Sequence, residues 1–108
     1  MRHVEKALNK MPKEVQDFIS ISNVADKEGV APVVMFSVQS DPVSIVGVNG
    51  VQATEMLLYV QHLFASLNDA FPCAENESTL EYIQQALQAQ AWRTADREDR
   101  GVEGKNEL

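Results

Sequence analysis

The sequence predicts an α+β protein in which short N-terminal helices and a small antiparallel β-hairpin precede a long antiparallel pair of helices. Two observations carry this prediction. Residues 33–39 are rich in β-branched and aromatic types and run into the turn Ser40-Asp41-Pro42, which is typical of a hairpin strand. Beyond residue 50, two long segments have apolar residues at helical spacing and are joined only by the short loop DAFPC. Helices joined by so short a loop lie antiparallel.

The first part of the chain supplies the short elements. A weak helix is expected over residues 2–10, and Pro12 can open a second short helix that extends to about residue 21. The strand at 33–39 is expected to pair with a short strand at about 43–47. Two strands alone are marginally stable, so the hairpin needs a partner surface or another subunit. The residues of the second helix expected to face inward are Val15, Phe18 and Ile19.

The remainder predicts the two long helices. The first is expected from Val51 to about Asn68, capped by Asn49 or Thr54, with Glu55 at its positive end. The second is expected from about Glu75 to Arg100, ended by Gly101 and Gly104. The apolar faces are Leu57, Val60, Phe64 and Leu67 in the first helix and Leu80, Ile83, Leu87 and Ala91 in the second, whereas Gln84, Gln85 and Gln88 are expected to face outward.

Composition limits the function classes. A chain of 108 residues forms one domain at most, with residues 1–46 as an N-terminal part and residues 47–108 as a helical hairpin with a short tail. A net charge of −7 argues against binding DNA or long RNA. No apolar run spans a bilayer and the N-terminus lacks a secretory signal, so we expect a cytoplasmic protein. The single Cys73 fits a reducing compartment.

The most informative feature is a cluster of arginines near the carboxyl end. Arg93, Arg97 and Arg100 are spaced to lie on one stripe of a helix. One interpretation is helix chemistry, with ion pairs from Asp96 to Arg100 and from Arg93 to Asp96. The other is phosphate binding, because a guanidinium matches phosphate oxygens and stays charged. Folding the second helix back on the first places residue 93 near the level of residue 50.

Four further side chains have two interpretations each. Trp92 is either a core or interface anchor or a stacking surface for a purine, and Phe71 and Tyr59 share this ambiguity. Asn76 is either the N-cap of the second helix or a ligand-binding amide, if Ser78 with Glu81 forms a competing capping box. Asn76 and Arg93 lie roughly 25 Å apart along a helix, so only two antiparallel protomers could bring them to one ligand.

The sequence contains no recognisable catalytic constellation. His3, His62 and Cys73 match no zinc spacing, and there is no phosphate-binding glycine loop or Ser-His-Asp set. We therefore expect no catalytic residue, no metal and no cofactor. An enzyme that cleaves a messenger would depend on His62 as its acid or base.

Several motifs resemble one known family. GVNGV, FPCAEN, LQAQAW and RTADREDRGVEG, in that order over about residues 47–104, resemble the helical-hairpin family of phage proteins that counter bacterial CBASS and Thoeris immunity. The preceding segment FSVQSDPVSIVGVNG resembles the hairpin of the Thoeris-directed branch. That branch has glycine before the proline, where this sequence has Asp41.

The resemblance implies a sponge: a binding protein that sequesters cyclic nucleotide messengers uncleaved in the cytoplasm of the bacterial host, so that the immune effector stays off. The implied ligands are cyclic ADP-ribose isomers, cyclic dinucleotides and cyclic trinucleotides, held between the protomers of a dimer or hexamer. By motif position, Asn76, Arg93 and Arg97 resemble the residues that face an ADP-ribose-type ligand, and Arg100, Gly101 and Val102 those near a second site. Phe71 joins them as a candidate stacking residue. The alternative is a helical adaptor or structural protein that binds a partner protein.

Overall fold

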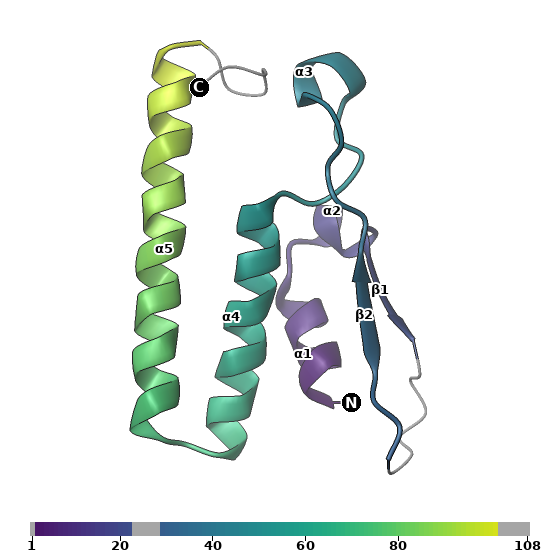
Figure 1. Ribbon diagram of the computed structural model, residues 1–108, viewed down its shortest axis with the longest axis vertical. Coiled ribbons are helices and arrows are strands. Elements are labelled where there is room, and N and C mark those ends of the chain that lie inside the picture. Colours follow the sequence, from purple (N-terminus) through teal and green to yellow (C-terminus); the bar gives the residue numbers. More distant parts are fainter. Residues whose placement is uncertain (1, 23–28, 102–108) are drawn as a thin grey trace.

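The computed structural model describes residues 2–22 and 29–101 (Figure 1). The helices and strands form in the order α1 (Arg2–Lys10), α2 (Lys13–Gln16), β1 (Ile19–Ser22), β2 (Val33–Phe36), α3 (Val43–Val46), α4 (Ala53–Ala70) and α5 (Ala74–Asp99). Helix α4 packs against α1 on one side and α5 on the other, and the two-stranded sheet lies beyond α1 (Figure 1). The expected α+β architecture, with short helices, a β-hairpin and a long helical hairpin, is confirmed.

The pairing within the hairpin differs from the expectation. Strand β2 pairs antiparallel with β1, with Ile19 opposite Phe36, and residues 43–46, expected as the partner strand, form the single helical turn α3. Pro42 precedes that turn with φ −63°, and Gly47 ends it with φ +76°. Val46 N donates to the Pro42 carbonyl at 3.1 Å and Gly47 N to the Val43 carbonyl at 2.9 Å, so local bonds close a helical turn in place of a strand pairing. The second short helix also ends earlier than expected, because Ile19–Ser22 alternates apolar and polar residues as a half-buried strand does.

A small core joins the N-terminal elements to α4. Its buried members are Ala7, Met11, Val15, Ile19, Val51 and Tyr59. Val15 and Ile19 face inward as expected, and Phe18 packs beside them. Tyr59 is 3% exposed, its hydroxyl donates to the Val4 carbonyl at 3.1 Å, and its ring meets Phe36 edge-on at 5.4 Å. Tyr59 is therefore a core residue, and the stacking role considered for it is wrong.

The junction between the sheet and α4 depends on a close backbone contact. Val38 and Val51 form a parallel bridge, in which Val51 N donates to the Ser37 carbonyl and Gln39 N donates to the Val51 carbonyl, each at 2.8 Å. A Cβ added at Gly50 would lie 2.5 Å from the Ser37 oxygen. Glycine is thus required here because no side chain fits between the two segments. This contact fixes where α4 begins.

The segment 39–50 closes on itself above that bridge. Gln39 donates through Nε2 to the Gly47 carbonyl at 2.9 Å and accepts from Asn49 N at 3.0 Å. Asn49 in turn accepts from Ser40 N at 2.9 Å and donates to the Ser40 carbonyl at 3.0 Å. We call this segment the clamped loop. Its tip, α3, carries Ile45 with 77% of its surface exposed.

The long helices begin at other caps than those expected. Helix α4 starts after Gln52, whose N–H donates to Glu55 Oε1 at 2.7 Å, so neither Asn49 nor Thr54 is the cap. Helix α5 starts after Cys73, whose Sγ accepts from Asn76 N at 3.4 Å, so Asn76 is not the cap either. After α5, Gly101 has φ +73°, as expected for a helix-ending glycine; Gly104 lies outside the described residues.

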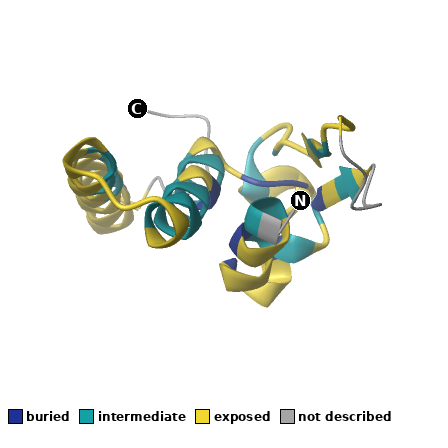
Figure 2. Ribbon diagram, turned by 90° about the horizontal axis from the view of Figure 1, so that it is seen from below, coloured by how far each residue is buried: buried dark blue, intermediate teal, exposed yellow. Residues whose placement is uncertain are grey.

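The protein is flat, and α5 forms its outer edge. The principal extents are 49 × 31 × 18 Å and the radius of gyration is 16.0 Å, against about 13 Å for a compact chain of this length. Figure 2 shows exposed residues over most of α5. Among the described residues, no helix is long and apolar enough to cross a membrane. The broad exposed face of α5 is available to a further partner.

Candidate functional site

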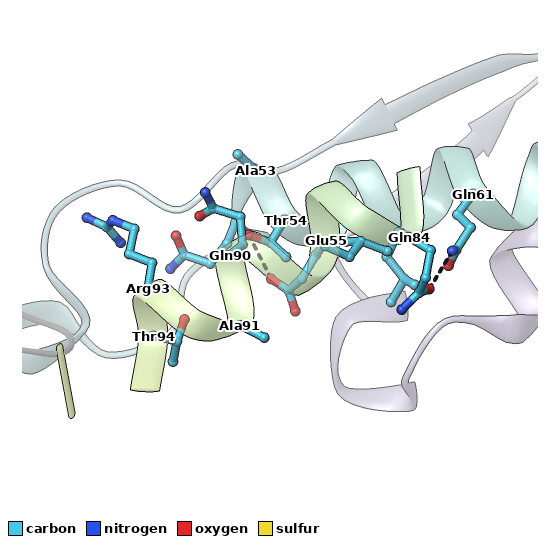
Figure 3. Close-up of a pocket in the computed structure, with 12 residues that line it drawn as sticks. Ala53, Thr54, Glu55, Gln61, Gln84, Gln90, Ala91, Arg93 and Thr94 are labelled. Carbon is cyan, nitrogen blue, oxygen red and sulfur yellow. Dashed lines mark hydrogen bonds between the residues drawn. The ribbon is translucent and has the colours of Figure 1, made fainter. Parts of the chain in front are cut away.

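A groove of about 730 Å³ lies between the start of α4 and the second half of α5 (Figure 3). We call it the interhelical groove. The residues that matter most for its chemistry are Gln52, which precedes α4, Thr54 and Glu55 of α4, and Gln90, Arg93 and Thr94 of α5. The groove therefore confirms that residue 93 reaches the level at which the first long helix begins.

The polar groups of the groove are arranged along its length. Arg93 lies at one end, and at the other end Gln61 donates to Gln84 across the two helices at 2.8 Å (Figure 3). Between them are the Glu55 carboxylate and the Gln90 amide (Figure 3). Gln84 is exposed, as expected, and its side chain also reaches Gln61 of α4.

The three clustered arginines have different environments. Arg93 is exposed and makes no hydrogen bond or ion pair within residues 2–22 and 29–101. Arg97 is 4% exposed and is the buried residue of α5. Arg100 is exposed and its Nε lies 3.1 Å from Asp96 Oδ2. The expected Asp96–Arg100 ion pair is confirmed, whereas the Arg93–Asp96 pair does not form in the described part, which leaves Arg93 open to a ligand.

Two of the other candidate residues, Phe71 and Asn76, lie at the end of α5 away from Arg93. Phe71 is largely exposed in the loop before this helix, and Asn76 Nδ2 donates to the Phe71 carbonyl at 3.4 Å. Because α5 is one continuous helix, Asn76 and Arg93 are separated by about 25 Å, and one protomer does not bring them together. Gly101 is exposed beyond α5, and Val102 lies outside the described residues.

The aromatic residues of α5 are on the surface. Trp92 is 68% exposed, so its interpretation as a core residue is wrong, and a role at an interface or against a base stays a prediction. Tyr82, on the same helix, is exposed to nearly the same extent. Large exposed aromatic side chains are enriched where proteins bind partners.

His3 and Cys73 make hydrogen bonds that support the fold, and His62 is partly buried. Burial, with a smaller contribution from the Lys10 charge, lowers the pKa of His62 below its ordinary value. His3 Nδ1 lies 2.7 Å from Ser66 Oγ, and Cys73 accepts the capping bond of α5. Within the part of the chain that the structure describes, no group of three or more His, Cys, Asp or Glu side chains is placed to hold a metal.

Sequence reasoning missed the polar residues that line the groove. Gln52, Gln90 and Thr94 have no distinctive spacing, and amide side chains are common on exposed helix faces. A usable signal was the difference in helix length. Because α5 is longer than α4, its second half extends past the start of α4, and the residues there border a space that the two helices leave open.

Comparison with known proteins supports the resemblance seen in the motifs. No family model matches the chain. Over 70 residues it is 37% identical to Thoeris anti-defense 1 of Bacillus phage SBSphiJ7, a match that covers 64% of this chain and 49% of that protein. The chain thus spans about half the length of this curated relative. Over this part of its length the chain is therefore similar to a phage Thoeris anti-defence protein, in line with the resemblance of its motifs.

Proposed function

We propose that this protein counters Thoeris immunity by binding a cyclic nucleotide messenger in the bacterial cytoplasm and holding it without cleavage. The observation that carries the proposal is Arg93, an exposed guanidinium at one end of a groove of about 730 Å³. Pockets of about 300–1,000 Å³ are typical of small-molecule sites. The relationship to a Thoeris anti-defence protein supports the same function.

Sequestration asks for tight, reversible binding rather than for chemistry. A guanidinium can bind phosphate through paired charge-assisted hydrogen bonds, and these strengthen as water is excluded. The candidate ligands are cyclic ADP-ribose isomers and cyclic di- or trinucleotides, the last at a second site near Arg100, Gly101 and Val102.

We further propose that the site is completed by a second copy of the chain. Tyr82, Ala86, Ala89 and Arg93 follow one another at four, three and four positions, so they share one exposed face of α5. Antiparallel pairing of two such faces, centred midway between Asn76 and Arg93 at about residues 84–85, would bring Asn76 of one copy to the level of Arg93 of the other. A dimer or a hexamer built from such dimers satisfies this arrangement.

The test is a binding experiment with a charge-matched control. A panel of cyclic ADP-ribose isomers, cyclic dinucleotides and cyclic trinucleotides is added to the purified protein, and melting temperature and native mass are measured. We expect at least one ligand to raise the melting temperature by linkage and to be recovered intact after heat denaturation. Arg93→Ala is expected to weaken the binding of that ligand about 10- to 100-fold. Lys6→Ala, on the exposed side of α1, is expected to leave the affinity unchanged.

The opposite results are equally clear. Recovery of a linear product would refute sequestration and point to an enzyme. No stabilisation by any panel member would favour the alternative, an adaptor that binds a partner protein. The exposed aromatic rings of Tyr82 and Trp92 favour that alternative, and it predicts that Arg93→Ala changes at most stability.

A further inference from the structure

We propose that the interhelical groove binds the nucleoside part of the messenger, with Arg93 holding a phosphate at its mouth, and that it prefers a base with an exocyclic amino group. This inference rests on the proposed function. It adds an orientation and a base preference, and it assigns both to side chains of α4 and α5 to which the resemblance gave no role.

The carboxylate of Glu55 sets the orientation. Glu55 lines the groove, and its Oε1 is fixed by the hydrogen bond from Gln52 N at 2.7 Å, while Oε2 has no partner in the described part of the chain. A carboxylate repels phosphate and accepts hydrogen bonds from N–H and O–H groups. The middle of the groove therefore favours a neutral, donor-bearing group, and the phosphate is left at the Arg93 end.

Gln90 and Thr94 supply complementary groups on the opposite wall. They stand one turn apart on α5, both line the groove, and neither side chain makes a hydrogen bond to another described residue. An amide offers a donor and an acceptor together, which suits the edge of a nucleobase, and a hydroxyl suits a ribose. Figure 3 shows Gln90 between Arg93 and Glu55, so a base beside Glu55 and a phosphate at Arg93 both lie next to it.

The remaining walls fit a planar group. Leu58 of α4 and Leu87 and Ala91 of α5 give the groove an apolar surface, on which the face of a base can lie. The Gln61–Gln84 hydrogen bond closes the end away from Arg93. Because Arg93 also lies on the face of α5 proposed to meet the second copy, the phosphate would sit where the partner's Asn76 can reach it.

The experiment compares amino and deaminated forms of the same ligand. For each class that binds, the adenine form and its hypoxanthine counterpart are titrated by calorimetry, for example cyclic di-AMP against cyclic di-IMP. Wild type is expected to bind the adenine form about tenfold or more tightly, as a hydrogen bond to a charged group implies. Glu55→Gln and Gln90→Leu are each expected to bring the two forms to about the same affinity.

Two variants separate this inference from the proposed function. Glu55→Gln keeps an acceptor for the Gln52 N–H, since glutamine also serves in a capping box, so α4 stays capped while the charge is lost. Gln88→Leu, at an exposed position outside the groove, is the matched control for Gln90→Leu and is expected to change neither affinity. Arg93→Ala is expected to weaken both forms of the ligand equally.

Two kinds of result would overturn the inference, and they can be told apart. The base lies outside the groove if wild type binds the two forms equally. The same follows if Glu55→Gln and Gln90→Leu leave the preference intact while Arg93→Ala still weakens binding, and only the proposed function then stands. If wild type binds no member of the panel, the proposed function fails, and the base preference fails with it.

Discussion

Replacing Gly50 by alanine tests whether the contact between the sheet and α4 holds the fold together. The added Cβ would lie 2.5 Å from the Ser37 oxygen, 2.6 Å from the Val38 carbonyl carbon and 2.7 Å from Gln39 N. All three are backbone atoms, so no side chain can rotate away to relieve the clash. The Val38–Val51 bridge must open instead.

The expected loss follows from the bonds that hold the bridge. Val51 N to the Ser37 carbonyl and Gln39 N to the Val51 carbonyl, each 2.8 Å long, contribute about 1 kcal/mol apiece. Partial exposure of Val51, which is fully buried, adds to this, because burying a valine side chain stabilises a fold by about 1.5 kcal/mol or more. We therefore expect Gly50→Ala to lower the free energy of unfolding by about 2–4 kcal/mol.

Gly47→Ala is the matched control. Nothing lies within 4 Å of the Cβ position at Gly47, although its φ is +76°. With ψ at −171°, Gly47 lies in a backbone region that is essentially confined to glycine, so this substitution should cost only local strain of about 1–3 kcal/mol and should leave the bridge intact. Urea denaturation followed by circular dichroism gives both values, and amide exchange at Val51 reports on the bridge directly. Equal losses for the two variants, with Val51 still protected in Gly50→Ala, would refute the reasoning.

Three further predictions concern single side chains. Burial and the Lys10 charge lower the pKa of His62 in the folded protein, so the unfolded chain binds the proton more readily as the pH falls through 6.5. The free energy of unfolding should therefore decline from about pH 7.5 to about pH 5.5. His62→Gln should reduce that decline, and an unchanged slope contradicts this. Tyr59→Phe leaves the Val4 carbonyl without its donor and should cost about 1 kcal/mol in urea denaturation, a value near zero being the contrary result. Asp41 has φ +66°, so Asp41→Val should lose about 1–2 kcal/mol while Asp41→Gly changes stability by less than about 0.5 kcal/mol; thermal melts in which both variants match wild type would contradict the strain.

The long helices were predictable from the sequence, but the partner of β2 was not. Apolar spacing and a short loop are enough to define α4 and α5, since both signals are local. The segment 43–47 is rich in β-branched residues, yet Pro42 and Gly47 confine it to one turn. The strand that does pair, Ile19–Ser22, follows directly on α2, and its apolar residues also fit the periodicity of a longer helix.

The position of the candidate site along the long helices was predictable from the sequence, but the side chains that line it were not. The position of Arg93 follows from helix lengths alone. The burial of Arg97 and the hydrogen bond between Gln61 and Gln84 depend on how two helices face each other around their axes, which spacing within one helix does not determine. The capping role of Cys73 was equally hidden, because cysteine is an uncommon cap.

The clamped loop is held in shape by hydrogen bonds near its two ends. Gln39 and Asn49 tie its two ends to each other and to nearby backbone, so the fold below requires nothing of the residues at its tip. Substitutions at the exposed Ile45 are therefore expected to leave the scaffold intact.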